Sequence, residues 1–393
     1  MRSKGSAQPS SSNNHRRGAT GVEGENGEAT KQQLTGNSDE SESIQRKPIN
    51  IVVQTVISSL TLLADGQRFL SGDKNGKIRC WRIEDGEEMG MSIDAGSPVS
   101  CVAASQDGSW IVAGTESGQV VVWAAGTGQK VKTFTYEKRM NSVDVSSDGT
   151  KIAMAADDKI VSVYPLLDGK KLCGWKDWDF HMVKFSPQGF FLAIGAEQGE
   201  SSLLSVYDTR GDQLLGTRRT SARSIAWTSD SKQLFALSSD GDIQCVDPYS
   251  LRTILKWPIH STDNPTCISL SSNGAFIAAS ANASISFWDT LTHEQIGFVI
   301  HYPGPVDCMT VSSNFDLLIG GSPGITLWDL HGVLSTPHID HQVSRSPLPK
   351  LRPFNIVTAR NPLQKDSIAP QSDNQRALHP AHHLTARRQT EGR

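Results

Sequence analysis

A repeat of about 41 residues, present in seven copies, predicts an all-β fold: a single seven-bladed β-propeller with four-stranded antiparallel blades. A turn motif such as Ser-Asp-Gly is centred on residues 65, 107, 148, 188, 230, 273 and 314. An aromatic or apolar residue ends an alternating run at positions 81, 123, 164, 207, 246, 288 and 328. Both markers keep a spacing of 39–43 residues throughout, so the seven copies are expected to share one structure.

Each copy is expected to contain four short strands separated by tight turns. Asp107-Gly108 and Ser117-Gly118 are typical hairpin turns, because glycine accepts the positive φ that such turns require. The strands predicted for the second copy are Val99–Ala103, Trp110–Ala113, Val120–Trp123 and Lys130–Phe134.

Closing the ring requires a strand from outside the last repeat. After Asp329 the chain offers only Gly332–Leu334, which is a weak outer strand. Pro48–Val53 is a strong β-former that precedes the first inner strand, expected at Ile57–Leu63. We therefore expect Pro48–Val53 to supply the outer strand of the seventh blade, which would remove both open sheet edges.

The repeats resemble those of the WD-repeat propeller family. Trp288-Asp289 and Trp328-Asp329 are the dipeptide that names the family, and Tyr207-Asp208 and Val246-Asp247 are degenerate forms of it. The Asp that such repeats place six residues before the Trp survives only as Asp158 and Asp240, and no copy carries the Gly-His dipeptide. We therefore expect these blades to depend more on apolar packing than on the polar network typical of the family.

The composition predicts three regions. Residues 1–47 and 335–393 are polar or proline-rich, and we expect both to be disordered tails around a propeller at 48–334. The propeller has 22 Lys+Arg and 31 Asp+Glu, giving −9, and the C-terminal tail has 9 and 4, giving +5. An acidic propeller is not expected to bind nucleic acid. No secretory h-region or membrane-length apolar run is present, which predicts an intracellular protein.

A search for catalytic motifs predicts no enzyme and no cofactor. The six cysteines form no C-x-x-C pair and lie in apolar runs, so buried free thiols are expected and no metal site. Gly72–Lys77 resembles a phosphate-binding loop but is one residue short and falls at a hairpin turn. A quinone-cofactor propeller dehydrogenase remains a remote alternative, because those enzymes normally have eight blades and a secretory signal. His181 and Asp144 are interpreted as polar residues satisfied within the blade packing.

We expect a scaffold, monomeric within a larger complex, that binds a protein or peptide on one rim of the propeller. Loops that lead into a new blade are the expected site, because the blades hold them while their sequence varies. Three such loops are rich in the aromatic and basic side chains that dominate interfaces, although packing between blades explains the tryptophans equally well. The predicted partner-binding residues are Tyr136, Lys138, Arg139, Trp175, Trp178, Phe180, Trp257 and His260.

One further motif suggests an alternative partner. Tyr207-Asp208-Thr209-Arg210 resembles the W-D-x-R sequence of WD proteins that recruit substrates to cullin-4 ubiquitin ligases, with Tyr in place of Trp. The resemblance implies that Tyr207, Asp208 and Arg210 contact the ligase adaptor, with Arg210 on the rim opposite the loops described above.

Overall fold

A computed structural model describes residues 47–334, apart from Met91, Gly169, residues 199–200, Asp212, residues 260–264 and Pro323. The side chains of Gln198 and Ser201 are not described either. Except for Lys47, the two predicted tails lie outside the described residues, and the domain boundaries remain predictions.

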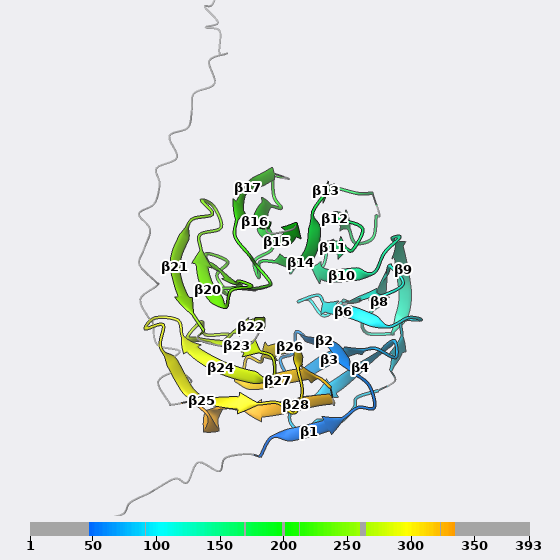
Figure 1. The fold of residues 1–393 in the computed structure, drawn as a ribbon. Coiled ribbons are helices and arrows are strands. Elements are labelled where there is room, and N and C mark those ends of the chain that lie inside the picture. Colours follow the sequence, from blue (N-terminus) through cyan, green and yellow to red (C-terminus); the bar gives the residue numbers. More distant parts are fainter. Residues whose placement is uncertain are drawn as a thin grey trace, which may run out of the picture. The chain divides into compact units, whose positions relative to one another are not determined.

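Seven four-stranded antiparallel sheets form a ring, so the predicted fold class is confirmed (Figure 1). Within blades 1 to 6 the strands follow chain order from the centre outwards. Blade 1 contains β2 (Ile57–Leu62), β3 (Arg68–Asp73), β4 (Lys77–Arg82) and β5 (Ile93–Asp94). Blade 2 contains β6 (Val99–Ala104), β7 (Trp110–Thr115), β8 (Gln119–Ala124) and β9 (Gln129–Thr135), close to the predicted bounds. Blade 3 contains β10 (Met140–Val145), β11 (Lys151–Ala156), β12 (Ile160–Pro165) and β13 (Cys173–Lys176).

The second half of the ring repeats this arrangement. Blade 4 contains β14 (Asp179–Phe185), β15 (Phe191–Gln198), β16 (Ser201–Asp208) and β17 (Gln213–Arg219). Blade 5 contains β18 (Ser224–Trp227), β19 (Leu234–Leu237), β20 (Asp242–Val246) and β21 (Thr253–Pro258). Blade 6 contains β22 (Pro265–Leu270), β23 (Phe276–Ala281), β24 (Ser284–Asp289) and β25 (Gln295–His301). Blade 7 contains β26 (Val306–Val311), β27 (Asp316–Gly321), β28 (Gly324–Asp329) and β1 (Ile49–Val52).

The seventh blade is closed by the N-terminal segment, as predicted. Strand β1 pairs antiparallel with β28, and Ile49 lies opposite Leu327 (Figure 1). After β28 the chain forms a short 3-10 helix, Leu330–Gly332, instead of an outer strand. Gly324 has φ +155°, and a β-carbon there would lie 2.4 Å from the carbonyl oxygen of Ile51. A residue without a side chain is therefore needed where β1 approaches β28.

Apolar packing between neighbouring blades forms the core, as expected. The cluster between blades 6 and 7, for example, combines Phe276 and Phe287 with Leu317 and Ile319. Comparable clusters join blades 1 and 2, 2 and 3, 3 and 4, 4 and 5, and 7 and 1. The sheets on either side of these seams are thus stabilised by burying their faces against each other.

Hydrogen bonds between inner strands add a polar contribution, which the sequence predicted only for His181. A side chain near the start of one inner strand reaches a backbone carbonyl at the start of the next blade. These contacts are Ser58 to Val99 (2.5 Å), Asn141 to Phe180 (2.9 Å), His181 to Ala222 (2.9 Å) and Arg223 to Pro265 (3.3 Å). One residue further along, serine hydroxyls accept from the next blade's N–H groups: Ser59 from Val102 (3.0 Å), Ser142 from Val183 (3.2 Å) and Ser224 from Ile268 (3.0 Å).

We expect Ser224→Ala to lower the free energy of unfolding by about 1–2 kcal/mol, because it leaves the buried N–H of Ile268 without an acceptor. Ser100→Ala is the matched control, since the buried Ser100 hydroxyl has no hydrogen-bond partner among the described residues. The control should be neutral or slightly stabilising. Urea denaturation of both variants measures the difference, and equal effects would contradict a stabilising role for the inner-strand serines.

Candidate protein-binding surfaces

The strand order gives the propeller two different rims. The turns between first and second strands and between third and fourth strands lie at one end of each blade. The turns between second and third strands, and the connections to the next blade, lie at the other end. We call the first end the lower rim and the second end the upper rim; the predicted partner-binding residues belong to the upper rim or to strands that lead to it.

The connection between β9 and β10 carries three of the predicted partner-binding residues. The side chains of Lys138 and Arg139 are exposed, and Arg139 Nε donates to Asn141 Oδ1 at 3.3 Å. Tyr136 is half-buried against the core between blades 2 and 3, and this burial raises the pKa of its phenol. The two basic residues are therefore accessible, whereas Tyr136 mainly packs.

The tryptophan-rich segment before blade 4 was predicted to be a loop, but most of it belongs to strands β13 and β14. Trp175 lies within β13, and only Asp177 and Trp178 separate this strand from β14. The Trp175 ring meets that of Tyr207 edge-on at 5.2 Å, and both Trp175 and Trp178 are half-buried against the core between blades 3 and 4. Phe180 is buried in the same cluster. Packing between blades, one of the two interpretations left open, thus accounts for these aromatic residues.

Trp257 occupies a similar position at blade 5. It lies in β21, where its buried ring contacts those of Phe235 (6.3 Å between centroids) and His293 (4.6 Å). His260, predicted to act beside it, lies outside the described residues. Trp257 therefore has very little exposed surface to offer a partner.

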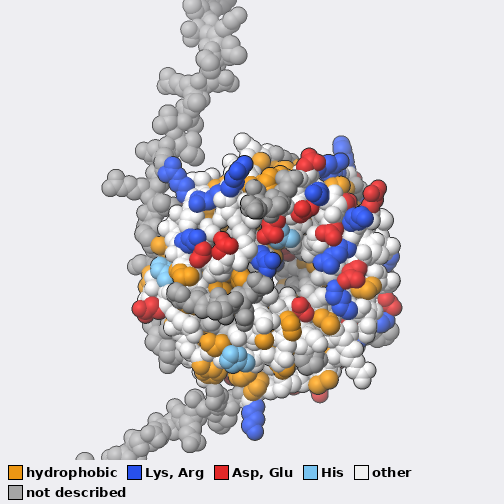
Figure 2. Space-filling view, in the orientation of Figure 1, with side chains coloured by type: hydrophobic (Ala, Val, Ile, Leu, Met, Phe, Trp, Pro, Cys, Tyr) orange, Lys and Arg blue, Asp and Glu red, His pale blue; other side chains and the backbone are white. Residues whose placement is uncertain are grey.

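The upper rim also carries ion pairs between adjacent blades. Lys74 of blade 1 lies 2.5 Å from Glu116 of blade 2, and Lys159 of blade 3 lies 3.4 Å from Asp179 of blade 4. The face shown in Figure 2 has charges of both signs intermingled over its upper and right parts, whereas hydrophobic side chains gather towards the bottom. Surface pairs of this kind contribute little to stability, so they mainly balance the charge of the rim.

His181 and Asp144 take structural roles, as expected. His181 Nε2 donates to the backbone carbonyl of Ala222 at 2.9 Å. The Asp144 carboxylate accepts from the backbone N–H of Phe185 at 2.7 Å, and burial raises the pKa of this carboxyl. Both residues join neighbouring blades.

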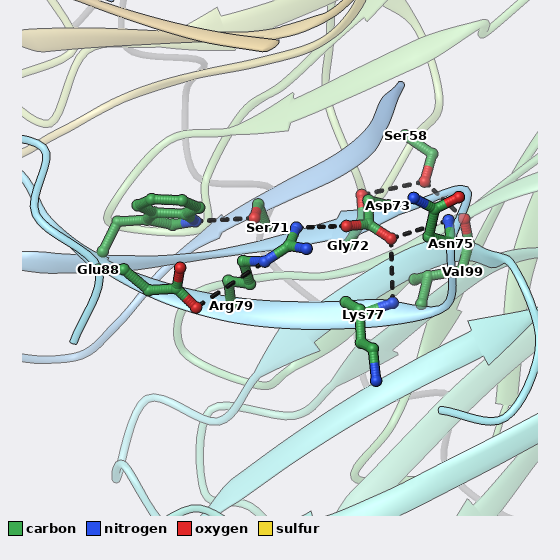
Figure 3. Close-up of polar contacts among 10 residues, drawn as sticks. Ser58, Ser71, Gly72, Asp73, Asn75, Lys77, Arg79, Glu88 and Val99 are labelled. Carbon is green, nitrogen blue, oxygen red and sulfur yellow. Dashed lines mark hydrogen bonds and ion pairs between the residues drawn. The ribbon is translucent and has the colours of Figure 1, made fainter. Parts of the chain in front are cut away.

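Blade 1 contains a polar network that the sequence analysis missed (Figure 3). The buried carboxylate of Asp73 accepts from the backbone N–H groups of Asn75 (2.9 Å) and Lys77 (3.0 Å) and pairs with Arg79. Trp81 Nε1 donates to Ser71 Oγ at 2.8 Å in the same sheet. Gly72–Lys77, which resembles a phosphate-binding loop in sequence, is thus a hairpin turn organised by Asp73. Asp73 lies two residues before Asn75, the position at which WD repeats normally carry their Asp.

A cluster of exposed aromatic and basic side chains lies on the lower rim between blades 4 and 5. The Arg210 guanidinium stacks on the Phe190 ring at 4.7 Å and pairs with Asp208 at 2.7 Å. The Tyr249 ring meets Phe191 edge-on at 5.0 Å. We call Phe190, Arg210 and Tyr249 the Arg210 cluster.

This cluster is both accessible and rigid. Tyr249 is 60% exposed, the Arg210 side chain 49% and Phe190 37%. The hydrogen bond that Arg210 donates to the Asp208 carboxylate, with smaller electrostatic contributions from Asp208 and Tyr249, raises the pKa of Arg210, so the guanidinium remains charged. Because the ring of Tyr249 rests on buried Phe191, the exposed groups are held in place before any partner arrives.

All six cysteines are free thiols, with Cys101 and Cys245 buried. Desolvation raises the pKa of each of these two thiols to about 12. Because only the thiolate reacts, iodoacetamide at pH 8 is expected to modify them at least about a hundredfold more slowly in the native protein than in urea. Peptide mass spectrometry measures this ratio, and rapid native modification would contradict the packing around these strands.

Neither a metal-binding group nor a membrane-spanning helix occurs among the described residues. No group of three or more His, Cys, Asp or Glu side chains there could hold a metal ion. The described part of the chain likewise has no helix of the length and apolarity that crossing a membrane requires.

Comparison with known families agrees with the propeller fold. The family described as "WD domain, G-beta repeat" matches residues 50–82, 91–124 and 251–289. Each match spans the outer strand of one blade and the first three strands of the next, and the last match ends on Trp288-Asp289 in β24. The chain is a WD-repeat β-propeller. Its other repeats lack enough of the family pattern to be matched, although their strands complete the same ring.

Several proteins are similar to parts of this WD-repeat chain. The human U3 small nucleolar RNA-associated protein 18 homolog is 28% identical over 148 residues, which is 36% of this chain and 26% of that protein. Protein ROOT INITIATION DEFECTIVE 3 of Arabidopsis thaliana is 25% identical over half of each chain. Eukaryotic translation initiation factor 3 subunit I of Neurospora crassa is 20% identical over 65% of this chain and 66% of that protein. The match thus spans about a quarter to two thirds of these relatives.

Proposed function

We propose that this WD-repeat propeller is a non-catalytic intracellular scaffold that binds protein partners and acts as one component of a larger assembly. The observation that carries this proposal is the Arg210 cluster. Arg and Tyr are the side chains most enriched among residues that dominate interface energies, and here they are exposed on a rigid frame. The relatives support the same role, since one of them is named as a subunit. The net charge of −9 over residues 48–334 disfavours nucleic acid as the partner.

On the upper rim, we propose Lys138, Arg139 and the exposed part of Trp178 as partner contacts. The other aromatic residues of the predicted set contribute by holding the blades that carry these loops. Replacing Trp175 and Trp178 would therefore disturb the fold as well as the surface. Variants of exposed residues are a cleaner test.

The test compares the proteins that co-purify with tagged full-length chains in cell lysate. We expect Arg210→Ala/Tyr249→Ala to lose at least one partner that the wild type retains. Leu291→Ala is the matched control, because Leu291 is exposed on the lower rim of blade 6, outside the cluster. Melting curves verify that the variants are folded, and identical partner sets would contradict the proposed surface.

A cullin-4 adaptor is a second candidate partner, favoured by the position of Arg210. The turn between β16 and β17 places it on the lower rim, half-exposed, where the resemblance requires it. Tyr207, which replaces the Trp of the motif, is buried against Trp175. Recovery of the adaptor by the wild type but not by Arg210→Ala would support this candidate, and absence of the adaptor from wild-type purifications would contradict it.

A further inference from the structure

Lysine side chains gather on the outer side of the seam between blades 2 and 3. In blade 2, Lys132 of β9 donates to the carbonyl of Leu167 at 2.9 Å, and its ammonium lies 5.2 Å from the centre of the Phe134 ring. In blade 3, the end of the Lys171 side chain lies over Gly174, in the place that a β-carbon would occupy. We call Lys132, Lys171 and Lys176, the last residue of β13, the seam lysines.

Strand register places these side chains on the facing sides of the two blades. Lys132 and Phe134 are alternate residues of β9, and Phe134 packs against the core between blades 2 and 3. Lys176 lies opposite Ile160, on the side of blade 3 that carries Tyr164 of the same core. The rings of Phe134 and Tyr164 meet across the seam at 4.9 Å. The seam lysines therefore border one continuous surface.

The seam lysines also differ from most other lysines of the ring because they lack a carboxylate partner. Six other lysines pair with Asp or Glu at 2.5–3.4 Å, whereas none of the seam lysines does so within the described part of the chain. Residues 160–176 contain one carboxylate, Asp168, in the turn between β12 and β13. Lys176 has only the weakest of the effects on the pKa of Asp158, which burial raises. Positive charge at this seam is thus largely uncompensated.

Exposed aliphatic side chains lie beside this charge. Leu167 and Leu172 belong to the same turn of blade 3, and they are 62% and 41% exposed. The carbonyl of Leu167 is the group that accepts from Lys132, so the turn is held against blade 2. Large aliphatic residues that are exposed together on a fixed frame are typical of a surface that binds another protein.

We propose that this seam surface binds an acidic segment of a partner protein that also carries aliphatic residues. Its carboxylates would meet the unpaired ammonium groups, and its aliphatic side chains would cover Leu167 and Leu172. The surface lies on different blades from the Arg210 cluster, so this inference goes beyond the function proposed above and does not depend on it.

Charge favours such a segment over other occupants. The chain's own tails are not acidic, since residues 1–47 have 7 Lys+Arg and 6 Asp+Glu, giving +1, and residues 335–393 carry +5. An anionic membrane would extend past the seam and be repelled by the propeller, whose net charge is −9. A short segment meets only the local charge, because salt screens exposed charges beyond about 8 Å.

The test measures fluorescence anisotropy of fluorescein-labelled peptides with the full-length protein at low salt. The acidic probe is Gly-Asp-Asp-Leu-Leu-Asp-Gly, and two further probes replace each Asp by Asn or each Leu by Ser. We expect the acidic probe to bind at least about tenfold more tightly than either of the others.

Lys171→Gln/Lys176→Gln is expected to weaken binding of the acidic probe about tenfold, because it removes two of the unpaired charges. Lys232→Gln/Lys256→Gln is the matched control, since it removes two exposed charges of blade 5, and it should have no effect. Melting curves verify that both variants are folded.

Four results would overturn the proposal. Equal binding of the three probes would show that neither charge nor aliphatic contact matters. Equal weakening by the two lysine variants would reveal general attraction between opposite charges. Sedimentation with phosphatidylserine vesicles that Lys171→Gln/Lys176→Gln abolishes, without peptide binding, would assign the surface to a membrane. Concentration-dependent self-association that the same variant abolishes, again without peptide binding, would assign it to a second copy of this chain.

Discussion

Removal of residues 1–53 is expected to abolish cooperative folding of the propeller. Strand β1 pairs with β28 along four residues, and it brings Ile49, Ile51 and Val53 into the core between blades 7 and 1. Losing these backbone hydrogen bonds and apolar contacts is expected to cost about 5 kcal/mol or more, which is comparable with the net stability of many proteins. The truncation also exposes β28 as an open sheet edge, so aggregation is expected.

Thermal unfolding followed by circular dichroism measures this effect. The matched control removes residues 1–46, which keeps Lys47 and the whole of β1, and it should melt as the full-length chain does. Blade closure by β1 would be refuted if the two truncated chains melted at the same temperature.

Phe276→Ala is expected to produce the second large effect. Phe276 is fully buried, and its ring lies 6.1 Å from that of Phe287 and 6.3 Å from that of Phe315. Truncating such a side chain typically costs about 3–5 kcal/mol, because the cavity closes only in part, and should lower Tm by roughly 10 °C.

The control for this variant is Phe298→Ala in the same blade. Phe298 is 46% exposed in β25, and its loss should cost less than about 1 kcal/mol. Calorimetry of both variants provides the comparison. Similar melting temperatures would mean that the stability of blade 6 does not depend on its packing against blade 7.

Strand positions could be predicted because each repeat carries its own local information. Alternating side chains define the strands, and glycines such as Gly108 and Gly118 have the positive φ that the sequence led us to expect. Ring closure was also predictable, because Pro48–Val53 is a strong β-former that the seven repeats do not need for themselves.

The orientation of the aromatic residues was not predictable in the same way. Trp175 was expected in a loop, but β13 continues to Lys176 and directs the indole towards Tyr207 in the next blade. The local sequence carries no information about where the neighbouring sheet lies. Most of the inner-strand hydrogen bonds were missed for the same reason, since their partners lie about 40 residues away in the chain.

The sequence by itself determined the number of blades, their four-stranded pattern, the closing strand and the family, because each of these follows from periodic local preferences. Only the tertiary structure decided which aromatic residues are buried and which surfaces can receive a partner. The Arg210 cluster joins residues 190, 210 and 249. Such sites arise from packing between blades, which brings together side chains that are distant in sequence and carry no shared local pattern.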